Sequence, residues 1–405
     1  MRVLVYPHTM DLGGSQLNAV ELAAAVQGLG HEVTLYADPG ALVAHAQDRG
    51  LEVLTRRRSP LCPSPERVWE LRRLVRERRF DILHGYEWPP ILECHAASWG
   101  TVGVAPTGTV MSMGVADFIP ESSPLIVGTE RLRRLTAPTR RGPVHLMEPP
   151  VDVVANAPGE HAARFRSTLP AAPGALVVIV ARLAHELKLE GILTAIRTVG
   201  ELSRHREVRL VVAGDGPARG EVREAAAAAN AGRNTAPVLL VGALDDPRGA
   251  YDAADLCIGM GGSALRSMAF AKPLIVQGEG GFFETLRPTT VPLFLDQGWY
   301  GLGDLDAAGA SARLEGLLVE LLDNPGVAHE LGTYGRSLVL NRFSLEAAAK
   351  SLVLIYETAL VDTPSTPPAG EVLRSAARLS AHKTSDRWQR LRGRAHSDDF
   401  NARPL

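Results

Sequence analysis

The stretch RVLVYPHTMDLGGSQLNAVELAAAVQGLGHEVTLYA, residues 2–37, decides the fold of this chain. It opens with a short run of aliphatic and β-branched residues. It continues through a loop with two adjacent glycines into a helical pattern, and it ends on a second strand-like run. Strands that alternate with helices are joined by crossover connections, which place the strands side by side and parallel. The stretch therefore predicts the first strand–helix–strand unit of a parallel α/β sheet.

The same alternation of strands and helices occurs twice along the chain. It continues to PVHLMEPPVD, residues 143–152, where Pro149 and Pro150 interrupt it. It restarts with ALVVIVARL, residues 175–183, and ends with the helical pattern SLEAAAKSLVLIYETAL, residues 344–360. The fold class is therefore α/β, with two Rossmann-like, doubly wound domains that we expect to face each other across a cleft.

These patterns set the expected domain boundaries. Residues 1–152 are expected to form an N-terminal domain and residues 153–362 a C-terminal domain, whose last helix packs back on the first domain. Residues 363–405 read as a linker and a basic tail, because VDTPSTPPAG is rich in turn residues and residues 371–405 hold eight Lys and Arg against four Asp and Glu. We expect the tail to be partly disordered, and a helix that binds a partner or a lipid is the alternative. Any peripheral contact with a partner is expected there.

The composition argues against several classes of protein. The formal net charge is −2 and 22% of the residues are charged, so the overall charge does not favour binding to nucleic acid or to a membrane surface. Cys62, Cys94 and Cys257 are isolated, which argues against a disulfide framework and a structural zinc site. The first apolar run is too short for a signal peptide, and no stretch approaches the roughly 20 apolar residues of a spanning helix. We expect a cytoplasmic enzyme.

Ligands of open α/β sheets bind beyond the carboxyl ends of the strands, so the loops there are the candidate site. The first loop places Gly13 and Gly14 before a helix, with Ser15 as the expected N-cap. Adjacent glycines let the backbone approach a ligand, and a helix N-terminus favours an anion. A tight turn without a ligand is the alternative for this loop.

Three loops of the second domain combine glycines with cations. VARLAHELKLEGI, residues 180–192, carries Arg182 and Lys188, and lysine occurs only four times in the chain. VVAGDGPARGE, residues 211–221, carries Gly214 after a strand. ADLCIGMGGSALRSMAF, residues 254–270, leads from a strand into a helix through three further residues, namely Gly261, Gly262 and Ser263. Two cations and two glycine-rich turns predict a diphosphate as the ligand.

The first domain offers a candidate acceptor surface. The segment HGYEWPP places His84, Tyr86, Glu87 and Trp88 at a strand end. Aromatic faces with one carboxylate suit a sugar or a polyol. The alternative is that the aromatic residues pack beneath the loop.

In their order and spacing, these segments resemble the retaining GT-B glycosyltransferases of family 4, over nearly the whole chain to about residue 362. The resemblance implies transfer of a sugar from a nucleotide-diphosphate donor, as substrate and with no cofactor, to a small-molecule or glycan acceptor. It implies that Arg182 and Lys188 stabilise the leaving diphosphate, with Gly14 beside the donor. It also implies retention of configuration and no metal ion, since fixed cations and helix amides take that ion's place.

The chain departs from the family pattern in the donor site. Family members usually carry two glutamates that flank seven residues, and Arg266 stands where a related glycine-rich subgroup has its glutamate. Ser112 or Met111 lies about where many members place a donor-side histidine, and Ser112 is also counted with the candidate acceptor residues. Glu279, in QGEGGFFE, is expected to reach the donor ribose or to pair with Arg266. These departures keep two alternatives open, a catalytically silent homologue that binds a nucleotide sugar or a partner enzyme, and a nucleotide-sugar epimerase.

Overall fold

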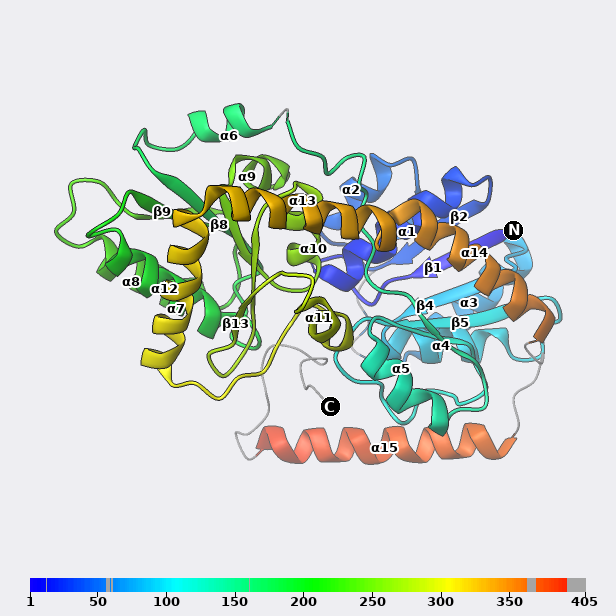
Figure 1. Cartoon of the computed structure of the whole chain (residues 1–405). Helices are drawn as coiled ribbons and strands as arrows, with labels where there is room; N and C mark the ends of the chain where they lie inside the picture. Colours follow the sequence, from blue (N-terminus) through cyan, green and yellow to red (C-terminus); the bar gives the residue numbers. More distant parts are fainter. Residues whose placement is uncertain (12, 56–58, 60, 160, 363–368, 392–405) are drawn as a thin grey trace. The chain divides into compact units, whose positions relative to one another are not determined.

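The computed structural model describes residues 1–11, 13–55, 59, 61–159, 161–362 and 369–391. The chain divides into two compact units (Figure 1). Unit 1 combines Met1–Pro149 with the segment that begins at Leu345, and unit 2 is Pro150–Ser344. The binding of the acceptor by one unit and of the donor by the other stays a prediction.

Unit 1 contains a seven-stranded sheet in the order β3-β2-β1-β4-β5-β6-β7, and every neighbouring pair is parallel. The interior strand β1 is almost entirely buried, and its Leu4 lies opposite Thr34 on one side and Leu83 on the other. Its strands are β1 (Arg2–Tyr6), β2 (Glu32–Ala37), β3 (Glu52–Thr55), β4 (Ile82–Tyr86), β5 (Ala105–Val110), β6 (Leu125–Val127) and β7 (Val144–Leu146).

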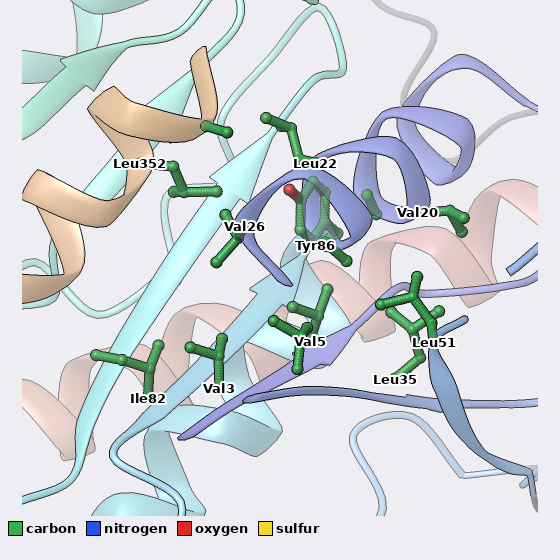
Figure 2. Close-up of a cluster of buried hydrophobic side chains, with 14 of the residues drawn as sticks. Val3, Val5, Val20, Leu22, Val26, Leu35, Leu51, Ile82, Tyr86 and Leu352 are labelled. Atoms are coloured by element: carbon green, nitrogen blue, oxygen red, sulfur yellow. The ribbon is translucent and has the colours of Figure 1, made fainter. Parts of the chain in front are cut away.

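Unit 1 also contains helices, most of which pack against its sheet. They are α1 (Gly14–Gly28), α2 (Leu42–Gln47), α3 (Pro65–Arg78), α4 (Trp88–Ser98), α5 (Glu130–Thr136), a 3-10 turn η1 (Ala137–Thr139), α14 (Leu345–Asp362) and α15 (Ala369–Leu391). Figure 2 shows side chains of α1 and α14 meeting those of the sheet, with Val26 and Leu352 above Val3 and Ile82. Burial of each such side chain contributes about 1.5–3 kcal/mol, so this core fixes α14 on unit 1.

Unit 2 repeats the design with a six-stranded sheet in the order β10-β9-β8-β11-β12-β13. All pairs are parallel except β12 with β13, which are antiparallel. Its strands are β8 (Ala175–Val180), β9 (Val208–Ala213), β10 (Val238–Gly242), β11 (Leu256–Gly259), β12 (Leu274–Gln277) and β13 (Phe283–Thr285). Its helices are α6 (Ala162–Ser167), α7 (Leu189–Leu202), α8 (Arg219–Asn230), α9 (Arg248–Ala253), α10 (Gly262–Ala269), α11 (Val291–Gln297), α12 (Ala307–Asp323) and α13 (Pro325–Arg342).

The prediction of two doubly wound parallel sheets is confirmed. The antiparallel edge strand β13 was not predicted. The long helix α15, which Figure 1 shows in red, occupies part of the segment read as a tail, for which a helix was the alternative to a partly disordered segment. Residues 363–368 and 392–405 of the predicted linker and tail lie outside the described residues. None of the described helices is long and apolar enough to cross a membrane.

Candidate active site

The two predicted catalytic cations lie on the loop from β8 to α7. Arg182 is exposed, and Lys188 is half-buried at the N-cap position of α7. Between them Leu187 has a φ of +66°, which an L residue rarely adopts, so the loop needs outside support to hold this conformation.

The turn after β9 supplies part of that support. Gly214 has a φ of +153°, and a Cβ there would lie 1.8 Å from the carbonyl oxygen of Ala181. This close approach lets the N–H of Leu183 donate to the Asp215 carbonyl at 3.0 Å, and the N–H of Ala218 donate to the Leu183 carbonyl at 2.9 Å. The structure therefore gives Gly214 a packing role beside the Arg182 loop, while donor contact by this glycine stays a prediction.

Two glutamates join the same loop to the segment after β12. The N–H of Leu187 donates to Oε1 of Glu279 at 3.1 Å, and the hydroxyl of Tyr300 donates to Oε2 at 2.5 Å. The carboxylate of Glu190, in the first turn of α7, accepts from the N–H groups of Gly281 at 2.7 Å and Gly280 at 3.1 Å. Glu279 therefore holds the loop that carries Lys188. Its expected contact with the donor ribose or with Arg266 stays a prediction.

The N-terminus of α10 lies against the end of β8. The hydroxyl of Ser263 donates to the Val180 carbonyl at 2.7 Å and accepts from the Tyr251 hydroxyl at 3.1 Å. Gly261 has a φ of +53°, its N–H donates to the Trp299 carbonyl at 2.8 Å, and a Cβ there would meet no atom within 4 Å. The turn is thus fixed by its neighbours yet open above Gly261, as a helix that binds an anion requires.

Arg266 folds back toward this N-terminus. Its Nη1 lies 3.3 Å from the position that a Cβ on Gly262 would take. Burial raises the pKa of Tyr251 to about 12, and the nearby charge of Arg266 acts in the opposite direction. The guanidinium therefore adds positive charge to the first turn of α10, on the same unit as Arg182 and Lys188.

In unit 1, the loop after β1 meets the loops after β4 and β5. Helix α1 begins at Gly14 with Gly13 as its N-cap, so the prediction of Ser15 as the cap is wrong. The Ser15 hydroxyl instead donates to Oε1 of Glu87 at 2.9 Å. A Cβ on Gly14 would meet no atom within 4 Å, so this glycine faces open space.

Glu87 is the centre of this loop cluster. Its side chain is 1% exposed, and its φ of +64° turns it away from strand geometry. Oε1 also accepts from the N–H of Met111 at 3.0 Å, and Oε2 accepts from the hydroxyl of Ser112 at 3.0 Å. Burial raises the pKa of Glu87, and these hydrogen bonds act against the rise. Glu87 thereby connects the three loops that carry the predicted residues Gly14, Ser112 and Trp88.

The raised pKa of Glu87 has a consequence for stability. The native state holds its proton more tightly than the unfolded state, whose pKa lies near 4.5. The wild-type chain should therefore lose stability relative to Glu87→Gln as the pH rises above that value, while the variant keeps the amide as a hydrogen-bonding group. Denaturant unfolding between about pH 4 and 8 measures this difference.

A matched control for this experiment lies on α14. Lys350 contacts Glu346 at 2.6 Å and lowers the pKa of that exposed carboxyl. The Glu346→Gln comparison should therefore show the opposite slope, because the wild-type chain gains relative stability as the pH rises through the titration of Glu346. A flat difference for Glu87→Gln would contradict a strained, buried carboxyl at position 87.

The aromatic residues around Glu87 are placed differently from one another. His84 is fully buried, with Nδ1 at 2.6 Å from the Tyr356 hydroxyl and Nε2 at 2.6 Å from Oγ1 of Thr109, and burial lowers its pKa to about 3. Tyr86 is 1% exposed. Both are core residues, so their placement does not support the expected contact with an acceptor. Trp88 is half-buried and packs edge-on against Phe118, with ring centroids 5.2 Å apart.

A cavity of about 360 Å³ lies elsewhere on unit 1, at the amino ends of β6 and β7. Its lining is Ser122, Pro124, Arg141, Gly142, Pro143, His145, Ile355, Thr358, Ala359 and Asp362. Because catalytic loops of parallel sheets follow the carboxyl ends of strands, this cavity is separate from the Glu87 cluster. Within the described residues, no three His, Cys, Asp or Glu side chains gather as metal ligands would, and independence from metal stays a prediction.

Two residues of these loops could not be singled out from the sequence. Glu190 looked like an ordinary acidic residue of a first helical turn, and Tyr300 belonged to no motif. Their partners are 91 and 21 positions away in the sequence, at Gly281 and Glu279. The pair of glycines at 280 and 281 was a usable signal, because adjacent glycine N–H groups are a common partner of a carboxylate.

The sequence of this chain is similar to known glycosyltransferases. The model of the "Glycosyl transferase 4-like domain" matches residues 13–116, and the model of "Glycosyl transferases group 1" matches residues 174–299. A 2-deoxystreptamine glucosyltransferase of Streptomyces kanamyceticus is 30% identical over 296 residues, which are 64% of this chain and 72% of that protein.

Solved structures share the fold over almost the whole chain. A glycosyltransferase from Rickettsia africae has a TM-score of 0.69 at 15% identity, and covers 89% of this chain and 98% of its own. Anabaena HepE, solved with UDP and glucose, has a TM-score of 0.69 at 12% identity (88% and 100%). Sucrose-phosphate synthase from Thermosynechococcus elongatus has a TM-score of 0.68 at 19% identity (89% and 100%). These likenesses confirm the predicted fold class.

Proposed function

The chain belongs to the group 1 glycosyltransferases of family 4, and from that premise we propose the reaction that it catalyses. It moves a hexosyl unit from a uridine-diphosphate sugar to a hydroxyl of a small polyhydroxylated acceptor, with retention at the anomeric carbon and without a metal ion. The donor binds unit 2, and the acceptor binds the loop cluster around Glu87 in unit 1.

One observation carries the donor half of this proposal. The loop with Arg182 and Lys188 is held by hydrogen bonds from the 214–218 turn and from Glu279, close in sequence to the N-terminus of α7. Negative charge accumulates on a departing diphosphate, and cations that are already in place stabilise it without reorganisation. Arg266 and the N–H groups in the first turn of α10 supply further positive charge to stabilise the diphosphate. The departing phosphate oxygen can then take the acceptor proton, so no separate base is required.

The curated relative suggests the acceptor class. Its name describes glucosyl transfer to 2-deoxystreptamine, an aminocyclitol. A ring of this kind has hydroxyl and ammonium groups at its edge and an apolar face, which suits carboxylates and aromatic side chains. We therefore take UDP-glucose as the first donor probe and 2-deoxystreptamine as the first acceptor probe.

The reaction is tested with the purified full-length chain. Release of UDP should depend on the acceptor and should continue in EDTA. Proton NMR should show an α-linked product, because UDP-glucose is itself an α-glycoside and the proposed reaction retains this configuration. A β-linked product would contradict retention, and loss of activity in EDTA would contradict a site based on cations of the chain. Other nucleotide sugars and polyols in the panel define the donor and the acceptor more closely.

A silent homologue is the second candidate, and Arg266 favours it. A guanidinium donates hydrogen bonds and accepts none, so it cannot bind the protons of the ribose hydroxyls as a glutamate does. Binding of UDP-glucose with neither transfer nor hydrolysis, measured by calorimetry and UDP release, would support this candidate over the enzyme.

A further inference from the structure

Helix α15 is attached to unit 1 by a buried carboxylate. Glu371, in its first turn, is 1% exposed. Its carboxylate accepts from the N–H of Ser122 at 3.0 Å, from the Ser122 hydroxyl at 2.8 Å and from the guanidinium of Arg141. A carboxylate that is removed from water needs such partners, so Glu371 fixes the start of α15 on the segment that precedes β6.

The next turns of α15 follow the same segment. The guanidinium of Arg378 donates to the Asp117 carbonyl at 2.8 Å and lies 3.3 Å from the carboxylate of Glu121. Arg374 lies 3.9 Å from the other oxygen of Glu121. Positions 371, 374, 378 and 382 follow the spacing of one helical face, so a single stripe of α15 faces unit 1.

This stripe ends beside the candidate acceptor surface. The imidazole of His382 lies 5.1 Å from the Phe118 ring and 6.3 Å from the Trp88 ring, between centroids. Trp88 directly follows Glu87. The segment that α15 contacts, from Asp117 to Ser122, comes shortly after Ser112, which is hydrogen-bonded to Glu87. Helix α15 therefore reaches the Glu87 cluster from both the loop after β4 and the loop after β5.

We propose that α15 forms part of the acceptor-binding surface. Glu371 and Arg378 are positioning residues that hold the 112–122 segment. His382 and Trp88 contact the ring of the acceptor, and the buried Phe118 packs behind them. The exposed imidazole of His382 and the half-buried indole of Trp88, supported from behind by Phe118, offer an apolar wall with polar edges, which suits the face of a sugar or cyclitol. The proposal rests on the proposed function, because it needs an acceptor bound to unit 1.

The test compares single variants of the full chain with a matched control on the same helix. Acceptor dependence is measured at saturating UDP-glucose with 2-deoxystreptamine, or with the panel acceptor that the wild type uses best. His382→Ala should raise the acceptor KM by about threefold to tenfold, with kcat and the affinity for UDP unchanged, because one ring contact is lost. Arg378→Ala should act in the same direction. Arg387→Ala, which removes an exposed charge from α15, should leave the acceptor KM unchanged.

Hydrogen exchange provides the measurement that needs no acceptor. Glu371→Gln should accelerate exchange across residues 112–122 and leave unit 2 unchanged. Unaltered exchange there, or an acceptor KM that moves equally in His382→Ala and Arg387→Ala, would overturn the proposal for α15. A wild-type chain that transfers sugar to no acceptor of the panel would instead contradict the proposed function, and the exchange result would still decide whether α15 positions the 112–122 segment.

Discussion

Replacement of Lys188 by alanine is expected to slow sugar transfer by at least about tenfold. A charge-assisted hydrogen bond to a phosphate contributes about 1.5–3 kcal/mol, and each 1.4 kcal/mol is a factor of ten. The loss should appear in kcat/KM for the donor, since the cation acts most strongly on the charge that develops as the diphosphate departs. Initial rates with UDP-glucose and calorimetry with UDP separate the rate effect from the binding effect.

The chain provides a matched control for this lysine. Lys350 is exposed on α14 and pairs with Glu346, so Lys350→Ala removes the same charge from the surface of unit 1. It should leave both rate and UDP affinity unchanged. If Lys188→Ala retains the wild-type rate and UDP affinity, the assignment of the β8–α7 loop to the diphosphate is wrong.

The sheets could be predicted from the sequence because the pattern that defines them is local. In residues 2–37 and again in residues 175–200, a short strand pattern is followed by a loop and a helical pattern, and this alternation is typical of parallel sheets. The same reasoning found the glycine turns, since a glycine after a strand is a local signal. It failed for the start of α1, where the N-cap is Gly13 and Ser15 faces Glu87.

The missed contacts of the site depend on tertiary proximity. Glu87 binds Ser15 and Ser112, which are 72 and 25 positions away, and Glu279 binds Leu187 across 92 positions. Hydrophobic periodicity carries no information about such pairs, because polar side chains at strand ends have no fixed period. The same limit applies to α15, whose attachment depends on Glu371 and a segment near Ser122 that is 249 positions away.

Arg266 is the point at which the family pattern and this structure differ most. From its place in the sequence, Glu279 is expected to reach the ribose or to pair with Arg266, yet both of its oxygens already accept hydrogen bonds from Leu187 and Tyr300. The Arg266 guanidinium lies against Gly262 in the first turn of α10, where helix amides favour an anion. Two readings follow, a cation that adds to the phosphate site of a working enzyme, and a residue left in a site that has lost its function.

The variant Arg266→Glu separates these readings. In a working enzyme it replaces a cation near the diphosphate with an anion, so the affinity for UDP-glucose should fall by at least about tenfold, or 1.4 kcal/mol, and transfer should slow further. Arg266→Met, which removes the charge without reversing it, should give a smaller loss. Arg223→Glu reverses an exposed charge on α8 of the same unit and should change neither quantity. Calorimetry with UDP-glucose measures the three variants side by side. In a site that has lost its function, the glutamate would restore the residue that the family pattern has at this position. A gain in donor affinity or activity for Arg266→Glu would therefore contradict the role of Arg266 in binding the diphosphate.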